Sequence, residues 1–342
     1  MPTSPSTPSS SLSAPSPAPA SAPAPARPAG LSAHGLELGY GPRTIVAGLD
    51  LDIPAGGFTV IIGPNGCGKS TLLRALSRML KPRGGSVTLD GADIARLRTK
   101  QVARNISTLA QAPATPTAIT VADLVARGRN PYQSLLQQWS AADEAAVASA
   151  LAEVAMTEHR ERLVEELSGG QRQRAWIAMA LAQETPILLL DEPTTYLDIS
   201  HQIDVLDLCA GLHEAGRTLV AVLHDLNLAA RYASHIVAMR DGRVVAEGPP
   251  ESVITSELLR SVFDLEALVI PDPETGRPLI VPRDRRARGT GSCSGPAAGS
   301  GPAADAVADP HAAEPTATAT ITHTTTPTDA VEPALMAEQE SA

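Results

Sequence analysis

One stretch of nine residues has the composition and spacing of a phosphate-binding loop, G-x-x-x-x-G-K-[ST]. It lies between the apolar run 58–62 and a helical pattern over 72–80, and its residues are Gly63, Pro64, Asn65, Gly66, Cys67, Gly68, Lys69, Ser70 and Thr71. The glycines let backbone N–H groups surround a phosphate, Lys69 supplies a cation for the β and γ oxygens, and Ser70 can hold Mg²⁺. The free N–H groups at the start of the following helix add positive potential. The stretch therefore predicts nucleotide binding.

Acidic and imidazole side chains follow two further apolar runs. Residues 186–190 lead into Asp191 and Glu192, and residues 218–223 lead into His224. Both runs are too short for a buried helix and are typical of central parallel strands, whose carboxyl ends carry the ligands in open α/β sheets. A lone histidine is more often structural, but we expect His224 to emerge at the same sheet edge as Asp191.

Three other positions carry weaker signals. Tyr40 lies in a turn upstream of Lys69, where its ring could stack on a base, although ordinary packing is the alternative. A Ser-Gly-Gly turn at residues 168–170 begins a helix, which makes it either a second anion-binding nest or simply a tight turn. The segment 106–110 delivers Gln111 to a junction between two parts of the chain.

The elements that must position these residues change in texture along the chain. Residues 36–54 alternate apolar and polar types between Gly and Pro turns, which indicates antiparallel strands. Strands then stop, and residues from about 101 to 165 are predicted to form a helical subdomain inserted in an α/β body. Its helices begin at the capping pairs Thr120 with Asp123 and Ser140 with Asp143.

After the strand predicted at residues 218–223, we expect a helix over 251–263 and a hairpin over 267–281. No strand is predicted between residue 223 and this hairpin.

Both ends of the chain lack the apolar residues that folding requires. Residues 1–30 are nearly all Pro, Ser, Ala and Thr, and residues 289–342 contain seven acids and no Lys or Arg. Such segments bury too little apolar surface to offset the entropy of ordering. We therefore predict disordered tails over 1–30 and 285–342, the second one acidic, around one folded domain at 31–284.

Composition excludes several classes of protein. The formal net charge of −10 is concentrated in the acidic tail, and the core shows no cluster of Lys and Arg that would bind nucleic acid. No run approaches the ~20 apolar residues that span a bilayer, and the first tail lacks the parts of a secretory signal. The three cysteines have neither disulfide nor metal-ligand spacing. We expect a protein that stays in the cytoplasm.

Cys67 also carries a hypothesis of its own. It precedes Lys69 at a helix N-terminus, and both features favour the reactive thiolate. The alternative is that it merely fills a position that requires a small residue.

With these features in one order, the chain resembles the ATP-binding subunit of an ABC transporter over about residues 33 to 283. The resemblance implies an α/β fold of the P-loop NTPase type, with an antiparallel β subdomain and an inserted helical subdomain. It also implies roles for the adenine-stacking residue, the Walker A loop, the Q-loop, the signature, the Walker B pair, the D-loop and the switch residue. These are, in that order, Tyr40, residues 63–71, Gln111, residues 167–171, Asp191 with Glu192, Asp198 and His224.

The same resemblance implies the mechanism. Glu192 polarises a water, Asp191 and Ser70 hold Mg²⁺, and Gln111 senses both metal and water. His224 donates a hydrogen bond on the γ-phosphate side. The signature residues that bind nucleotide are Ser168, Gly169, Gly170 and Gln171. They serve the ATP of a second subunit, so the single motif set implies two copies around a two-fold axis.

Within the family the chain is most similar to importers of iron-siderophores, haem and vitamin B12. The segments that carry this likeness are 191–199, 224–232 and 125–132. It implies a motor for ferric siderophore import on the cytoplasmic face of the membrane, with permease subunits and, indirectly, a substrate-binding protein. Residues 128–132 are implied to contact the permease, and a helix-ending loop is the alternative.

Other functions are less favoured by the sequence. A vitamin B12 or haem importer motor is the nearest alternative. A soluble ABC ATPase acting on DNA or ribosomes would carry a long coiled-coil insertion, a second motif set or a basic surface. An exporter motor would lack the importer-like segments.

Overall fold

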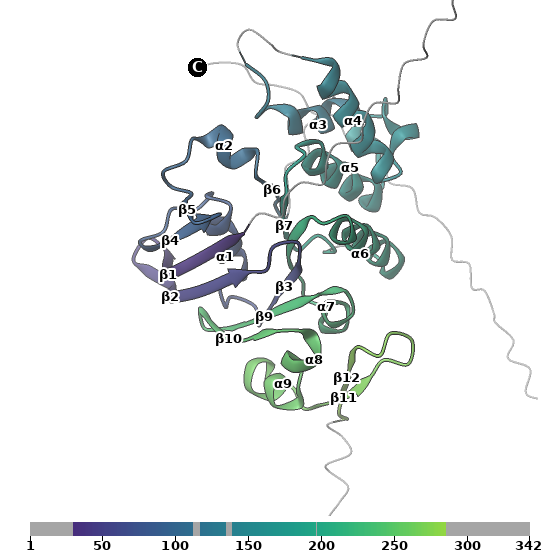
Figure 1. The fold of residues 1–342 in the computed structure, drawn as a ribbon. Helices are drawn as coiled ribbons and strands as arrows, with labels where there is room; N and C mark the ends of the chain where they lie inside the picture. The colour runs from purple at the N-terminus through teal and green to yellow at the C-terminus, as the bar shows by residue number, and fades with distance from the viewer. Residues whose placement is uncertain (1–29, 112–116, 135–138, 196, 285–342) are drawn as a thin grey trace, which may run out of the picture. The chain divides into compact units, whose positions relative to one another are not determined.

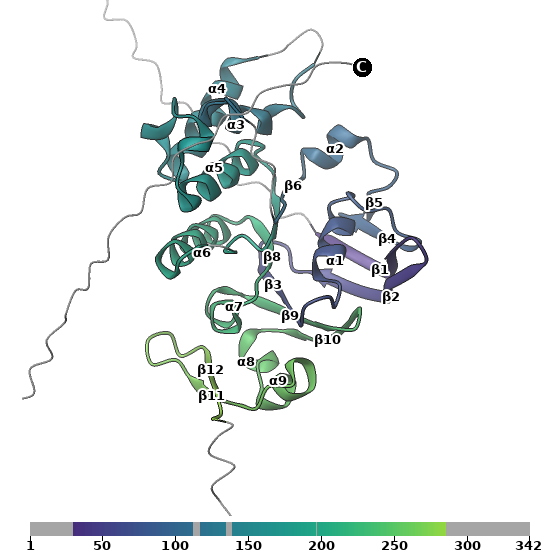
Figure 2. The same cartoon turned by 180° about the vertical axis from the view of Figure 1, so that it is seen from behind.

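The computed structural model describes residues 30–111, 117–134, 139–195 and 197–284, and the fold is drawn in Figures 1 and 2. The predicted tails therefore lie outside the described residues, apart from residue 30. Within the described ranges, no helix has the length and apolar character needed to cross a membrane.

An antiparallel sheet precedes the phosphate-binding loop and receives one later hairpin. Its order is β2-β1-β4-β5. The strands are β1 (Leu31–Tyr40), β2 (Arg43–Ile53), β4 (Gly84–Leu89) and β5 (Ala92–Asp93). Alternate residues of β1 such as Leu36 and Leu38 are fully buried, as expected for a sheet with one solvated face. The predicted antiparallel subdomain is confirmed.

A second sheet forms the centre of the molecule, in the order β10-β9-β3-β8-β7-β6. The strands are β3 (Phe58–Ile62), β6 (Ile106–Leu109), β7 (Ile187–Asp191), β8 (Thr218–Val222), β9 (His235–Arg240) and β10 (Arg243–Gly248). All pairs except β9 with β10 are parallel. Every residue of β3, β7 and β8 is buried, which explains their continuous apolar sequence.

The strands β9 and β10 were not predicted from the sequence. Their signal is present, because the apolar run of β9 ends at the dipeptide Asp241-Gly242, and Asp-Gly between two strands favours a tight hairpin. The strand β9 pairs with β3 on the side away from β8, so it extends the central sheet next to the phosphate-binding loop.

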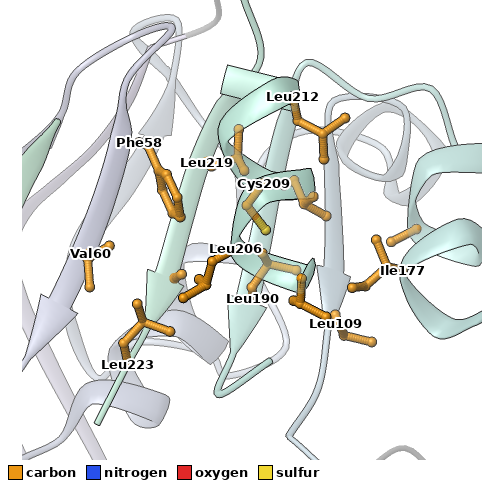
Figure 3. Close-up of a cluster of buried hydrophobic side chains, with 14 of the residues drawn as sticks. Phe58, Val60, Leu109, Ile177, Leu190, Leu206, Cys209, Leu212, Leu219 and Leu223 are labelled. Atoms are coloured by element: carbon orange, nitrogen blue, oxygen red, sulfur yellow. The ribbon is translucent and has the colours of Figure 1, made fainter. Parts of the chain in front are cut away.

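Helices cover both faces of the central sheet. The helices outside the inserted region are α1 (Lys69–Leu76), α2 (Thr99–Ala103), α6 (Ile199–Glu214), α7 (Leu226–Tyr232), α8 (Pro250–Val253) and α9 (Ser256–Phe263). In β7, Leu189 belongs to the core shared with α1 and the antiparallel sheet, whereas Leu188 belongs to the core under α6. Figure 3 shows this second core, where Leu206 and Cys209 of α6 lie against Leu190 and Leu219.

The inserted region forms a helical layer at one end of the sheet, which is seen in both views. It contains α3 (Val121–Ala126), η1 (Arg127–Arg129), α4 (Ala141–Glu153), η2 (Thr157–His159), η3 (Val164–Glu166) and α5 (Gly169–Ala182). Both predicted capping boxes are present, with Thr120 and Ser140 accepting from the N–H groups of Asp123 and Asp143. The strand β6 falls within the predicted interval 101–165 but is the edge strand of the central sheet.

One long side chain in the segment expected to contact a permease is buried. Arg129 is 3% exposed, and its guanidinium donates to Asp143 (2.8 Å), Glu184 (2.6 Å) and the carbonyl of Ala182 (2.7 Å). It also lies 4.0 Å from the ring centre of Tyr132. Because these contacts join η1 to α4 and α5, Arg129 is a structural residue, and contact of residues 128–132 with a permease stays a prediction.

The chain beyond α7 forms short elements that return to the core. The single helix predicted over 251–263 is two helices, because Thr255 caps a new start at α9. The predicted hairpin is confirmed as β11 (Ala267–Pro271) and β12 (Pro278–Pro282). The side chain of Asn227 in α7 pairs with the backbone of Ile280 in β12, accepting at 2.7 Å and donating at 3.4 Å.

Candidate active site

The phosphate-binding loop connects β3 to α1, and its glycines are required by backbone shape. Gly63, Gly66 and Gly68 have φ values of 154°, 79° and 108°. Such conformations are costly for residues with a Cβ atom. A Cβ at Gly63 would also overlap the carbonyl oxygen of Met239 in β9. The loop can therefore approach a ligand closely while resting on the neighbouring strand.

Lys69 is held at the mouth of this loop. Its side chain is buried, and its Nζ donates to the carbonyls of Gly63 at 2.8 Å and Pro64 at 3.1 Å. Above it lies a hollow of about 450 Å³. The hollow is lined by Arg43, Thr44, Ile45, Asn65, Gly66, Gly68, Lys69, Ser70, Thr71, Glu192, His224, Asp241 and Gly242.

Two oxygen ligands converge beside the lysine. The hydroxyl of Ser70 donates to Oδ1 of Asp191 at 2.8 Å, although the two residues are 121 positions apart. Burial raises the pKa of Asp191, and the hydrogen bond from Ser70 opposes this effect. A hydroxyl and a partly desolvated carboxylate are hard donors that suit Mg²⁺, which usually keeps several waters and takes few protein ligands. This pair therefore fits the predicted metal site.

Glu192 is the centre of a hydrogen-bonded cluster. Its Oε1 lies 2.6 Å from Nε2 of His224, while its Oε2 accepts from the hydroxyl of Thr195 at 3.1 Å and from the amide of Gln111. Its φ of 54° is left-handed, an unfavourable conformation for a residue with a Cβ and one found at functional sites. The structure thus brings together all three residues that the sequence marked as catalytic.

Other predicted binding residues lie outside the hollow. Tyr40 is exposed at the end of β1 and is not among the residues that line the hollow. Its hydroxyl accepts a hydrogen bond from Arg74 at 3.1 Å. Its role in stacking on adenine stays a prediction. Cys67 is 4% exposed, and burial raises the pKa of its thiol despite the nearby charge of Lys69. The expected shift toward thiolate is therefore wrong.

The signature residues form the start of α5 rather than part of this hollow. The hydroxyl of Ser168 accepts from the N–H of Gln171 at 3.3 Å, and the side chain of Gln171 accepts from the N–H of Ser168 at 3.1 Å. Gly169 is exposed, whereas Gly170 is buried. The residue Asp198 caps α6 and likewise does not line the hollow.

Some residues that line the hollow were not predicted from the sequence. Arg43, Thr44 and Ile45 come from the start of β2, and Asp241 with Gly242 come from the turn between β9 and β10. A Cβ at Gly242 would overlap the carbonyl oxygen of Ile45, so the two segments are in direct contact. Only the Asp-Gly turn had a recognisable signal, because the β2 residues belong to no motif.

Comparisons with known proteins identify the family to which the sequence is similar. Residues 46–195 match the sequence model of the ABC transporter family. The chain is 56% identical to the probable siderophore transport system ATP-binding protein YusV of Bacillus subtilis (strain 168) over 75% of this chain and 93% of the other. It is 55% identical to the ferric enterobactin transport ATP-binding protein FepC of Escherichia coli (strain K12) over 77% and 97%.

A solved structure shows the same fold. The dimeric structure of MJ0796, a bacterial ABC transporter cassette, matches with a TM-score of 0.57 at 28% identity, covering 64% of this chain and 98% of the other. This chain therefore belongs to the ABC transporter family, as one of its ATP-binding, ATP-hydrolysing proteins.

Proposed function

We propose that this chain is the motor subunit of a membrane importer for ferric siderophores. The observation that carries the proposal is the cluster of Gln111, Glu192 and His224 at the mouth of a phosphate-binding hollow. Relatives above 50% identity that are named for siderophore transport support the choice of cargo. The protein would act with permease subunits on the cytoplasmic face of the membrane, and indirectly with a substrate-binding protein.

The geometry indicates how hydrolysis would proceed. Phosphoryl transfer needs an in-line water and positive charge around the γ-phosphate. Lys69 and the N-terminal N–H groups of α1 would hold the phosphates, while Ser70 and Asp191 would hold Mg²⁺. Mg²⁺ held there would supply positive charge to neutralise the phosphates. The carboxylate of Glu192, positioned by Thr195, would orient the water.

The neighbours of Glu192 would also sense the nucleotide. His224 bonds Oε1 of Glu192, and its side chain is 44% exposed, so it is free to turn toward the γ-phosphate. Gln111 bonds the other carboxylate oxygen. A phosphate or metal that draws His224 or Gln111 toward itself would therefore change the hydrogen bonds to the Glu192 carboxylate. This coupling is consistent with hydrolysis that depends on a correctly bound nucleotide.

A second copy would complete the site. The residues Ser168 to Gln171 present a helix N-terminus that does not line the hollow of their own chain, although such ends favour anions. Beside Asp198, the side chain of Ile199 is 79% exposed, an unusual position for a large apolar residue next to a functional loop. Both features support a dimer in which each chain brings its signature and D-loop to the other chain's ATP.

Uptake in a deletion strain tests the proposal. We expect radiolabelled ferric siderophore uptake to be lost in the deletion strain, restored by the wild-type gene and not restored by Glu192→Gln. Normal ferric siderophore uptake, in a strain without another motor of this type, would contradict the assignment of cargo. A defect limited to cobalamin or haem uptake would favour one of those alternatives instead.

A further inference from the structure

Two helices that follow functional loops are joined at their first turns by one imidazole. The helix α5 begins after Ser168 and α6 begins after Asp198. His201 lies in the first turn of α6. Its ring contacts the first turn of α5 on one side and the Asp198 carboxylate on the other.

The contact with α5 is made at Gly170. A Cβ built at this position would overlap Cδ2 of His201 and would lie 2.9 Å from both Cγ and Nε2. Gly170 has ordinary helical backbone rather than a positive φ, so conformation does not require glycine there. The imidazole of His201 instead occupies the space that any larger residue would need. The ring is therefore packed directly against the signature backbone.

The contact with the Asp198 loop is made by hydrogen bonds. Oδ1 of Asp198 accepts from the N–H of His201 at 2.9 Å, from the hydroxyl of Ser200 at 2.9 Å, and bonds Nδ1 of His201 at 2.6 Å. These bonds, led by the His201 N–H, lower the pKa of Asp198 to about 2. An ionised carboxylate only accepts, so Nδ1 carries the proton. Nδ1 thus holds the loop, while the far edge of the ring faces Gly170.

Further contacts tie the same two helices together. Arg174 of α5 and Asp204 of α6 form an ion pair one turn further along both helices. A separate bond joins the Asp198 loop to its own helix, because the side-chain amide of Gln202 in α6 donates to the carbonyl of Leu197 at 3.0 Å. A displacement of the loop would therefore be passed to the signature helix, and His201 is the contact nearest to both motifs.

We infer that His201 is a positioning residue that holds the Asp198 loop and the Gly170 turn in one fixed geometry. Both motifs then reach the nucleotide of the partner copy together when the ATP-bound dimer forms. This inference rests on the proposed function, because it requires a second copy. His201 does not line the hollow of its own chain, so capture of ATP by a single chain does not depend on it.

The test separates nucleotide binding from turnover. In the full-length chain, His201→Ala should leave the Kd of a fluorescent ATP analogue within about twofold of wild type, while kcat falls on the order of tenfold to a hundredfold, the scale of a small misplacement of reacting groups. In a Glu192→Gln background, His201→Ala should also require roughly tenfold more ATP for dimerisation. His201→Asn keeps a donor for Asp198 but leaves the space beside Gly170 unfilled, and it should show the same split to a smaller degree.

The matched control is Ser200→Ala, which removes another hydrogen bond to Asp198 and leaves the ring in place. Its kcat and dimerisation should remain near wild type. Unchanged kcat and dimerisation in His201→Ala would overturn the inference, and so would a loss of ATP binding equal to the loss of kcat, which indicates a general structural defect. A parent Glu192→Gln protein that stays monomeric with ATP would contradict the proposed function, and this inference with it.

Discussion

Glu192 is the residue whose surroundings most constrain the chemistry. Its side chain is 10% exposed and its two oxygens have separate partners, His224 on one side and Gln111 with Thr195 on the other. These partners fix the orientation of the carboxylate by hydrogen bonds to both of its oxygens. A carboxylate held in this way can act as the general base for an attacking water.

Replacement of this carboxylate by an amide gives the first prediction. Glu192→Gln should bind ATP with wild-type affinity and lower kcat by about 10²- to 10⁴-fold, because the amide keeps the shape and loses the base. Lys69→Ala should instead fail at ATP binding, since it removes the cation of the loop. Steady-state kinetics and equilibrium binding distinguish the two. Turnover near the wild-type rate in Glu192→Gln, with permease present, would contradict the role of Glu192.

The environment of Cys67 leads to a prediction opposite to the one that its sequence neighbours suggested. Burial outweighs Lys69 and raises the pKa of the thiol, so the reactive thiolate is scarce and the sulfur is covered. N-ethylmaleimide should label Cys67 slowly in the folded protein and rapidly in urea, as followed by mass spectrometry of the peptide. Rapid labelling of the native protein, with loss of ATPase activity that Cys67→Ser prevents, would restore the earlier hypothesis.

Individual site residues could be predicted from sequence where a motif fixes their spacing. The motifs predict one metal site for Ser70 and Asp191, and their side chains are hydrogen-bonded to each other. Ile45 and Asp241 were not predicted because they line the hollow through a contact between two different sheets, where β2 meets the β9–β10 turn. The burial of Cys67 and Arg129 was not predicted either. Both have charged or polar neighbours in sequence, but residues that are distant in sequence enclose them.

At the scale of elements, the helical layer depends on one buried cation. Arg129 lies between α4, through Asp143, and the end of α5, through Ala182 and Glu184. Removing one partner of a buried ion pair costs about 3–5 kcal/mol, because the other charge is left uncompensated. Arg129→Met should lower the free energy of unfolding by this amount in urea titrations.

The control for Arg129 is an exposed arginine in the same layer. Arg162 is 43% exposed and lies 3.9 Å from Glu166, so Arg162→Met should change the free energy of unfolding by about 1 kcal/mol or less. Equal effects of the two substitutions would show that the buried contacts of Arg129 do not stabilise the layer.

Acid should weaken the same contact in a defined direction. The hydrogen bonds from Arg129 and Ser140 lower the pKa of Asp143 in the folded state. Above the unfolded pKa of roughly 3.9 the stabilisation is complete, and it is lost as the pH falls through the lower folded value. The difference in unfolding free energy between wild type and Asp143→Asn should therefore shrink below about pH 4. A difference that stays constant with pH would refute this role of the carboxylate.

Predictability differed between kinds of element. Strands such as β7 and helices with capping boxes were found because local pattern and tertiary environment agree. The strand β6 falls in the interval predicted to be helical, because a run of four residues is too short to be recognised as a strand from sequence. Only its pairing with β7 places it in the sheet. The split at Thr255 was missed because both halves of that segment are apolar on one face.

At the scale of the whole molecule, the described chain presents its signature turn and its Asp198 loop away from its own hollow. One motif set and a fold shared with a dimeric cassette favour two copies. The permease and the imported molecule are proposed from family likeness, because no contact among the described residues marks a surface for a permease. The sequence predicted the motor more fully than the assembly for this reason.

The exposed isoleucine beside Asp198 provides the sharpest test of that assembly. Ile199 is 79% exposed at the first position of α6, so Ile199→Asp removes no core packing, and a carboxylate in the first turn is favourable for the helix. If this side chain is buried between two copies, the new charge is desolvated on dimerisation at a cost of several kcal/mol. In a Glu192→Gln background, Ile199→Asp should remain monomeric by analytical ultracentrifugation at ATP concentrations that dimerise the parent, with ATP binding unchanged. Met79→Asp, at a position 66% exposed next to the end of α1, should dimerise normally. Full dimerisation of Ile199→Asp would place the interface elsewhere.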